Sequence, residues 1–295
     1  MTKHITVGYD GTSSSSEAVR WAAAEAAARG VALRVITCFD MPPVDATWGY
    51  SVADTIAAQE NQAADHCAAM VASIRRFQPG LEVEPYVGPG PAAPVLVAEA
   101  QATDNELTVV GASGHHGASA FWLGSTPRRV IRQSSAPLVV VRGRATGAHP
   151  DRVIVGIDGS ESADNALRWA EAEAARHGAQ LVLVHGWSYP YLAIDAVTNQ
   201  SRDLTRIDAA CVLERVEQAS RGRFGDEVTA CLIESTAADA LLHTATDGDM
   251  IVVGSRGRGA LTSVVFGSTV NAVLEHAAVP VAVVHPVPQD RREVA

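Results

Sequence analysis

The chain has 295 residues, of which 47% are hydrophobic and 19% charged, and its formal net charge is −10. A chain of this length can bury two ordinary hydrophobic cores. The acidic balance argues against a general binder of nucleic acid or of anionic membranes, which would normally be basic. No apolar run approaches the length of a membrane span and the N-terminus lacks a signal pattern, so we expect a cytoplasmic protein.

The first half of the chain alternates short apolar runs with segments of helical periodicity. Strands are predicted at 5–9, 32–39, 81–87, 107–110 and 137–142, and helices at 13–29, 52–77, 94–102 and 125–134. Strands that alternate with helices pair in parallel through right-handed crossovers. The predicted fold class is therefore α/β, with an open five-stranded parallel sheet of the Rossmann-like kind, covered on both faces.

The second half repeats this order, from a strand at 153–157 to a last strand at 281–285. Val-Gly-Tyr-Asp-Gly-Thr-Ser at 7–13 matches Val-Gly-Ile-Asp-Gly-Ser-Glu at 155–161. The period is about 145 residues, the usual size of a whole domain. We predict two tandem homologous domains with the following bounds: domain one 1–143, a polar linker 144–150, domain two 151–287 and a tail 288–295.

A glycine pattern follows the fourth predicted strand in both halves. Residues 111–114 read Gly-Ala-Ser-Gly, and after nine further residues Gly-Ser follows at 124–125. Residues 254–257 read Gly-Ser-Arg-Gly, and Gly-Ser follows at 267–268. Glycines at the end of a strand let the backbone approach a ligand, and the next helix start offers N–H groups to an anion. The pattern predicts a phosphate-binding loop in each half.

Carboxylates are predicted at the same edge of the sheet. Asp10 and Asp158 each follow the first strand of their half and precede a glycine. In open parallel sheets, ligands bind beyond the carboxyl ends of the strands, where the strand order reverses. A carboxylate there can accept hydrogen bonds from ribose hydroxyls or a base edge, or help to hold a metal. An Asp-Gly pair can also be no more than a turn, and a Ser-Thr pair at a helix start no more than a cap.

The candidate nucleotide-binding residues share this placement. They are Asp10, Gly111, Gly114, Gly124, Ser125 and Thr126 in the first half, and Asp158, Gly254, Arg256, Gly257, Arg258, Gly267, Ser268 and Thr269 in the second. The two arginines are included because a guanidinium matches the geometry of a phosphate. The loop of the first half lacks both arginines and continues with His115-His116. We interpret these histidines as part of a solvated loop, with a metal-binding or pH-sensing pair as the alternative. We expect the second site to bind at least as tightly as the first.

These motifs resemble those of the universal stress proteins, and the similarity covers essentially all of both halves. The ATP-binding subgroup of that family carries Gly-x2-Gly-x9-Gly-Ser/Thr, which 111–125 and 254–268 match in full. The resemblance implies a five-stranded, adenine-nucleotide-α-hydrolase-like sheet in each domain and ATP at the glycine loop, with or without Mg²⁺. It also implies that the first-strand aspartate lies near the ribose, and that Cys38 and Gly186 lie near the adenine.

The resemblance also bears on assembly, because family members commonly pair through their last strands. It implies an intramolecular pseudo-dimer in which 137–142 pairs with 280–285, or a homodimer. The four cysteines, Cys38, Cys67, Cys211 and Cys231, have no CxxC or metal-ligand spacing. We expect no metal site, and we expect Cys67 and Cys211 to be buried as small apolar groups.

Fast ATP hydrolysis needs a positioned water, a metal holder and charge stabilisation. The sequence has no Gly-x4-Gly-Lys-Ser/Thr loop, no His-Arg-Asp kinase loop, no His-x-Gly-His and no Ser-Gly-Gly-x-Asp-Ser. We therefore predict an ATP-binding stress-response regulator that has no catalytic residues and signals nucleotide state to an unidentified protein partner. The alternatives are a slow metal-dependent ATPase, whose turnover would require Asp158, and an interaction protein with vestigial nucleotide sites.

Overall fold

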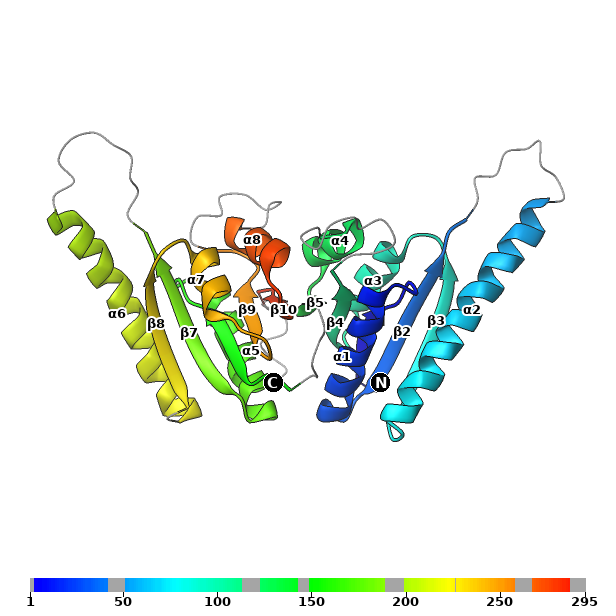
Figure 1. The fold of residues 1–295 in the computed structure, drawn as a ribbon, viewed down its shortest axis with the longest axis horizontal. Helices are drawn as coiled ribbons and strands as arrows, with labels where there is room; N and C mark the ends of the chain where they lie inside the picture. Colours follow the sequence, from blue (N-terminus) through cyan, green and yellow to red (C-terminus); the bar gives the residue numbers. More distant parts are fainter. Residues whose placement is uncertain are drawn as a thin grey trace. The chain divides into compact units, whose positions relative to one another are not determined.

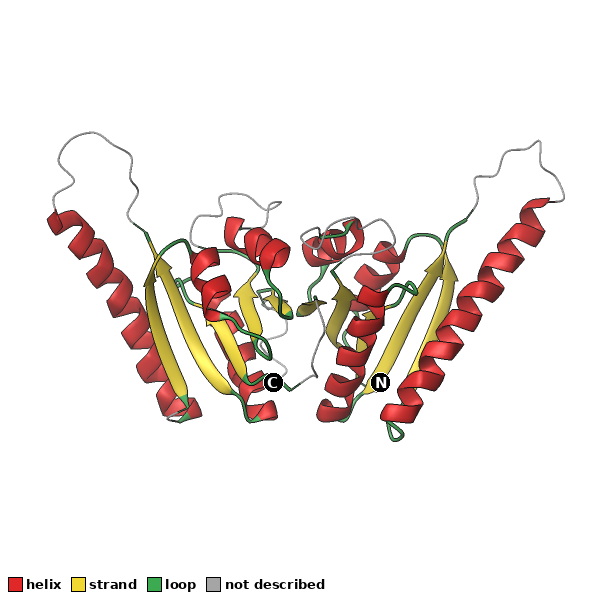
Figure 2. Ribbon diagram, in the orientation of Figure 1, coloured by secondary structure: helices red, strands yellow, loops and turns green. Residues whose placement is uncertain are grey.

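The computed structural model describes residues 3–41, 51–112, 123–142, 149–188, 199–225, 227–257 and 267–286. The chain divides into two compact units, Met1–Ala148 and His149–Ala295. Each unit is an α/β sheet with helices on both faces, as the ribbon shows (Figures 1 and 2). Of the helices in the described ranges, none is both long and apolar enough to cross a bilayer.

Unit 1 holds five parallel strands in the order β3-β2-β1-β4-β5. Its elements are β1 (His4–Gly8), α1 (Ser13–Arg29), β2 (Ala32–Phe39), α2 (Ser51–Phe77), β3 (Val83–Pro89), α3 (Ala92–Gln101), β4 (Asn105–Gly111), α4 (Ser125–Gln133) and β5 (Leu138–Val141). Helices α1 and α2 contact each other, as do α3 and α4, so the sheet lies between two helical layers.

Unit 2 repeats this arrangement, with the strand order β10-β9-β6-β7-β8. Its elements are β6 (Arg152–Gly156), α5 (Glu161–His177), β7 (Gln180–Trp187), α6 (Asn199–Phe224), β8 (Val228–Glu234), α7 (Ala237–Thr244), β9 (Met250–Gly254), α8 (Ser268–His276) and β10 (Val281–Val284). Helix α5 contacts α6, and α7 contacts α8. The predicted fold class is confirmed in both units.

The core of each unit forms where the central strands meet the helices. The first four residues of the central strand β1 (His4–Gly8) are buried, because strands covered on both faces have no solvent-exposed side. Small residues let the layers approach closely: a Cβ on Gly8 would lie 3.1 Å from Leu96 Cδ1, and one on Gly156 would lie 3.3 Å from Leu241 Cδ1. The two halves therefore repeat not only their elements but also this contact between the first strand and the helix that precedes the fourth.

The structure moves several predicted element boundaries. The third strand begins at Val83 rather than at residue 81, because Leu81 N–H donates to the Gln78 carbonyl in a turn. Helix α3 begins two residues earlier than predicted, at Ala92, since Pro91 takes the extended conformation suited to an N-cap. Residues 143–148 of the chain, which include most of the predicted linker, lie outside the described residues.

One burial prediction is half wrong. Cys67 is buried on α2, but Cys211 is exposed on α6. The buried side of α6 carries Ala209 and Leu213, each two positions from Cys211. Two positions correspond to about 200° around an α-helix, so Cys211 faces away from the core. The predicted pairing of 137–142 with 280–285 concerns two different units and stays a prediction.

Candidate functional site

The strand order of unit 2 reverses between β6 and β9, which lie side by side in parallel. From β6 the chain moves outward to β7 and β8 on one side, and then returns to β9 on the other. Helices on the two sides diverge at such a point and leave a crevice at the carboxyl ends of the strands. Asp158 follows β6 and Gly254 ends β9, so both predicted site residues lie at this edge.

The carboxylate of Asp158 is held by the turn that leads into α5. Its Oδ1 accepts a 2.9 Å hydrogen bond from Ser160 N–H. Gly159 has a φ of +73°, a left-handed conformation that glycine adopts without strain. Ser160 then caps α5, since its Oγ accepts a hydrogen bond from Ala163 N–H at 3.2 Å. One oxygen of Asp158, Oδ1, therefore serves the turn, as the turn interpretation of the Asp-Gly pair requires. The same hydrogen bond orients the carboxylate and thereby its second oxygen, Oδ2.

The end of β9 lies against the first turn of α5. A Cβ on Gly254 would lie 2.5 Å from Ser162 Oγ and 2.6 Å from the Ser162 carbonyl oxygen, so any side chain at 254 would force the strand end or the helix to shift. Two residues on, Arg256 N–H donates to Ser162 Oγ at 3.2 Å. Glycine at 254 is thus required by close backbone packing, and this packing fixes where the glycine loop leaves the sheet.

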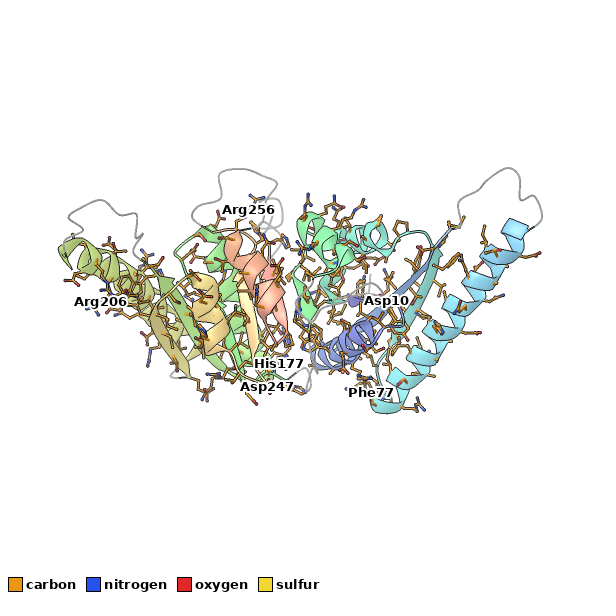
Figure 3. The ribbon with its side chains drawn as sticks, turned by 45° about the horizontal axis from the view of Figure 1, so that its top comes forward. Asp10, Phe77, His177, Arg206, Asp247 and Arg256 are labelled. Atoms are coloured by element: carbon orange, nitrogen blue, oxygen red, sulfur yellow. The ribbon has the colours of Figure 1, made fainter. Side chains whose placement is uncertain are left out.

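The loop brings the carboxylate, the glycines and a helix start together. A Cβ on Gly257 would lie 3.0 Å from Asp158 Oδ2, and one on Gly267 would lie 3.9 Å from Gly257 N. Gly267 is the N-cap residue of α8 and offers no side chain to the N–H groups of the first turn. Ser268 at the first position of α8 is exposed and Thr269 is half-buried. Figure 3 shows Arg256, which is exposed, in this part of unit 2.

Unit 1 builds the same edge from the equivalent residues. Asp10 Oδ1 accepts hydrogen bonds from Thr12 N–H at 3.0 Å and from Thr12 Oγ1 at 2.6 Å. A Cβ on Gly111 would lie 2.7 Å from Ser14 Oγ, which repeats the contact of the second unit. Gly124 N–H donates to the carbonyl of residue 112 at 2.9 Å, so the start of α4 lies next to the end of β4.

Helix α4 resembles α8 at its first turn. Gly124 is its N-cap residue, Ser125 is exposed and Thr126 is half-buried. Pro127 occupies the third helical position and is buried, where its missing N–H would have had no partner within the helix. The remaining predicted site residues, Gly114 and Arg258, lie outside the described residues.

The two residues predicted near the adenine end up in different surroundings. Gly186, in β7, faces the start of α7: a Cβ there would lie 2.7 Å from Ala237 Cα and 2.8 Å from its nitrogen. Cys38, in β2, is half-buried, and burial raises the pKa of its thiol above the ordinary value. Packing alone explains the glycine, so an adenine contact at either position stays a prediction.

Three residues that the sequence did not single out shape the two sites. Ser14 and Ser162 are the packing partners of the strand-end glycines, and both stand four residues after the aspartate of their half. That shared position is a signal the internal repeat could have supplied. Tyr9, which Ile157 replaces in the second half, lies beside Asp10; burial is the main cause that raises the pKa of its hydroxyl, and a hydrogen bond with Ser16 opposes the rise.

Each unit is therefore a doubly wound α/β domain with a carboxylate, a glycine loop and a helix start at its switch point. The profile of the universal stress protein family matches residues 1–142 and 150–285. The chain belongs to the universal stress protein family, which confirms the resemblance seen in its motifs.

Relatives of similar length match along nearly the whole chain. A universal stress protein of Mycolicibacterium smegmatis is 31% identical over 290 residues, covering 96% of this chain and 97% of that protein. One of Mycobacterium tuberculosis is 30% identical over 292 residues, covering 95% and 96%. Among solved structures, a universal stress protein from Archaeoglobus fulgidus superposes with a TM-score of 0.68 at 21% identity, over 97% of this chain and 99% of that one. These matches support the fold and the tandem arrangement.

Proposed function

We propose that each unit binds an adenine nucleotide at the switch point of its sheet, and that the bound nucleotide regulates contacts with a protein partner. ATP, with or without Mg²⁺, is the proposed ligand. One observation carries the proposal: in unit 2, Asp158, Gly257 and Gly267 meet at the start of α8. A carboxylate, a side-chain-free backbone and a helix N-terminus are the three features that a ribose and its phosphates require together.

Each group in unit 2 has a proposed role. The N–H groups of the first turn of α8 hold phosphate oxygens, helped by the hydroxyls of Ser268 and Thr269. The exposed Arg256 guanidinium neutralises phosphate charge. Asp158 accepts hydrogen bonds from the ribose hydroxyls. Mg²⁺ prefers oxygen ligands and keeps several waters while it binds phosphates, and the carboxylate and hydroxyls of this edge fit such an ion.

Unit 1 offers the same groups with fewer cations. Asp10, Ser125 and Thr126 repeat the acidic and hydroxyl groups, but the first-half sequence has Ser113 and His115 where the second half has Arg256 and Arg258. Pro127 contributes no N–H to the first turn of α4. We therefore propose that unit 2 binds the nucleotide at least as tightly as unit 1.

The test is to purify the chain without added nucleotide, denature it, and identify and count the nucleotide released per polypeptide. ATP titration by calorimetry, with and without Mg²⁺, then gives the number of sites on emptied protein. Substituting Gly257→Val places a branched side chain against Asp158, so it should remove one of two sites. Gly222→Ala is the matched control, since a Cβ there meets nothing within 4 Å.

The outcomes separate the proposal from its alternatives. One or two equivalents of nucleotide, reduced by Gly257→Val and unchanged by Gly222→Ala, would support a nucleotide-binding regulator. Metal-dependent turnover that Asp158→Ala abolishes would favour the slow ATPase. No nucleotide released, and no heat on adding ATP with Mg²⁺, would leave the interaction protein with vestigial sites and refute the proposal.

A further inference from the structure

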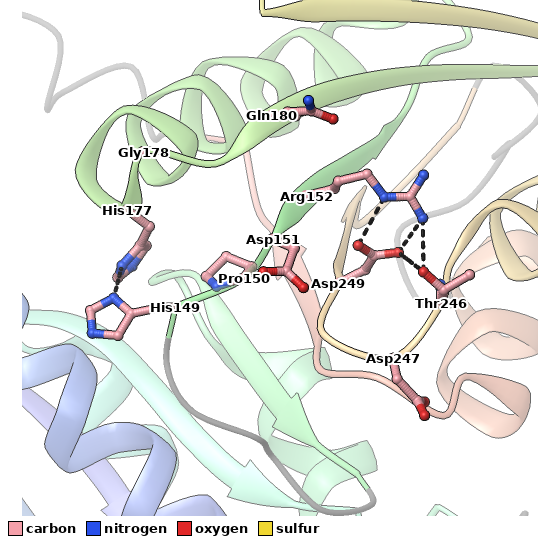
Figure 4. Close-up of a pocket in the computed structure, with 10 residues that line it drawn as sticks. All are labelled: His149, Pro150, Asp151, Arg152, His177, Gly178, Gln180, Thr246, Asp247 and Asp249. Atoms are coloured by element: carbon pink, nitrogen blue, oxygen red, sulfur yellow. Dashed lines mark hydrogen bonds and ion pairs between the residues drawn. The ribbon is translucent and has the colours of Figure 1, made fainter.

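A recess of about 500 Å³ opens in unit 2 at the amino ends of β6 and β7 (Figure 4). Figure 3 shows His177 and Asp247 of this recess far from Arg256, at the opposite end of the unit from the proposed nucleotide site. The recess is polar and carries His149, Asp151, Arg152, His177 and Asp247 among its lining residues. It has no part in the proposed nucleotide binding.

One part of this lining is an internal ion pair. Arg152 Nε donates to Asp249 Oδ1 at 3.0 Å, and the same guanidinium donates to the Thr246 hydroxyl at 3.0 Å. Asp249 also accepts from Thr246 N–H at 2.7 Å. Arg152 and Asp249 are thus partnered by each other and by Thr246, and the ion pair joins the start of β6 to the turn before β9. Its contacts are structural, so the search for a ligand site turns to the rest of the lining.

The other part is a pair of imidazoles. His149 Nδ1 lies 3.0 Å from His177 Nδ1, and the rings stand edge to face with centroids 5.1 Å apart (Figure 4). A divalent ion held tetrahedrally at ordinary Zn–N lengths needs its two nitrogens about 3.3 Å apart. The 3.0 Å contact is a hydrogen bond between the rings, so an ion would replace its proton. The rings would turn to point both lone pairs at the ion while their nitrogens separate by about 0.3 Å.

Two independent features favour a cation between these rings. Glu173 Oε2 lies 3.6 Å from Nε2 of His177, on the side of the ring away from His149. A carboxylate on the second nitrogen is the usual outer partner of a metal-binding histidine, because it fixes the tautomer and makes the first nitrogen a better ligand. His177 is also the last residue of α5, where the helix dipole is negative. The acidic side chains of Asp151 and Asp247 line the same recess and add to this field.

We propose that His149 and His177 bind a divalent transition cation of the zinc class, with water or an external ligand in the recess filling the remaining positions. Imidazole suits Zn²⁺, Ni²⁺ and Cu²⁺ and is a poor ligand for Mg²⁺ and Ca²⁺, which prefer oxygen. The ion would fasten residue 149, where unit 2 begins, to the end of α5. The site is separate from the nucleotide site and does not depend on it.

The experiment is calorimetric titration of the tag-free, full-length protein with Zn²⁺, in buffer without nucleotide. The proposal predicts saturable binding that His149→Gln or His177→Gln weakens about tenfold or more. The His243→Gln variant is the matched control, since His243 is an exposed histidine in the last turn of another helix of the same unit. A His115→Gln, His116→Gln double variant removes two histidines that are adjacent in the sequence of the first half and should keep the binding.

The thermal midpoint of each variant without metal shows whether it is folded. His149 is exposed at the first residue of the unit, so His149→Gln is the variant least able to disturb the fold. Added Zn²⁺ should raise the midpoint of the parent and of His243→Gln, but not that of His149→Gln. Binding of equal affinity in the parent, His149→Gln and His177→Gln, or no saturable binding in the parent, would overturn the proposal.

Discussion

The contact between the end of β9 and the first turn of α5 gives a sharp steric prediction. In Gly254→Ala, the new Cβ would lie 2.5 Å from Ser162 Oγ, 2.6 Å from the Ser162 carbonyl oxygen and 2.7 Å from its carbonyl carbon. The hydroxyl can rotate away, but the carbonyl belongs to the backbone of α5 and cannot. The strand end or the helix must therefore shift.

The cost can be worked from these contacts. Overpacking of this kind typically destabilises a fold by about 1–3 kcal/mol. The shift would also weaken the 3.2 Å hydrogen bond from Arg256 N–H to Ser162 Oγ, which adds about 1 kcal/mol. We expect the free energy of unfolding of unit 2 to fall by about 2–4 kcal/mol. Since the glycine loop leaves the sheet at this point, ATP binding in unit 2 should weaken by more than tenfold.

Urea unfolding followed by fluorescence and ATP calorimetry measure the two effects. Gly222→Ala is the control, because it adds the same methyl group in open space within α6, where it should stabilise by about 0.5–1 kcal/mol. Ser162→Ala alone is the reference for the double variant, because it removes the hydroxyl contact and also the acceptor of the Arg256 N–H hydrogen bond. Adding Gly254→Ala to Ser162→Ala should still destabilise the fold, since the carbonyl contact remains. A Gly254→Ala protein as stable as its parent would refute the steric reasoning.

Two further predictions concern other parts of the chain. Arg152→Met should lower the free energy of unfolding by about 3 kcal/mol, because among the described residues it leaves the buried carboxylate of Asp249 with Thr246 alone as donor. An unchanged urea midpoint would contradict this. Cys211 should react with iodoacetamide at pH 8 well before Cys67, because Cys211 is exposed while burial raises the pKa of the Cys67 thiol. Peptide mass spectrometry over time measures both alkylation rates, and equal rates would contradict the burial of Cys67 and the exposure of Cys211.

Much of the fold follows from local patterns in the sequence. Helix α1 begins and ends at the predicted residues because a capping hydroxyl, Thr12, precedes an Ala-rich segment and Gly30 ends it in the left-handed conformation. The starts of β3 and α3 each differ from the predicted residue by two positions. They are set by a turn at 78–81 and by the cap at Pro91, which depend on the packing of the chain around them. The error at Cys211 has a similar cause, since helical phase relative to the core is a tertiary property.

The candidate site divides in the same way. The spacing of the glycines and the position of Asp158 were enough to place both at the carboxyl edge of a parallel sheet, because alternating strands and helices allow essentially one handedness of connection. The spacing did not indicate why glycine is needed at each of these positions. Gly254 is required by the backbone of Ser162, whereas Gly257 and Gly267 leave room beside a carboxylate and a helix start.

The sequence by itself determined that this protein is two copies of one α/β domain with a glycine loop in each. An internal repeat and a hydrophobic period can both be recognised along the sequence, so neither requires knowledge of which distant residues are in contact. Only the tertiary structure decided which side chains meet. His149 and His177 are 28 residues apart and carry no shared motif, yet their nitrogens lie 3.0 Å apart. Such encounters arise when packing closes loops between distant segments, and no short-range pattern records them.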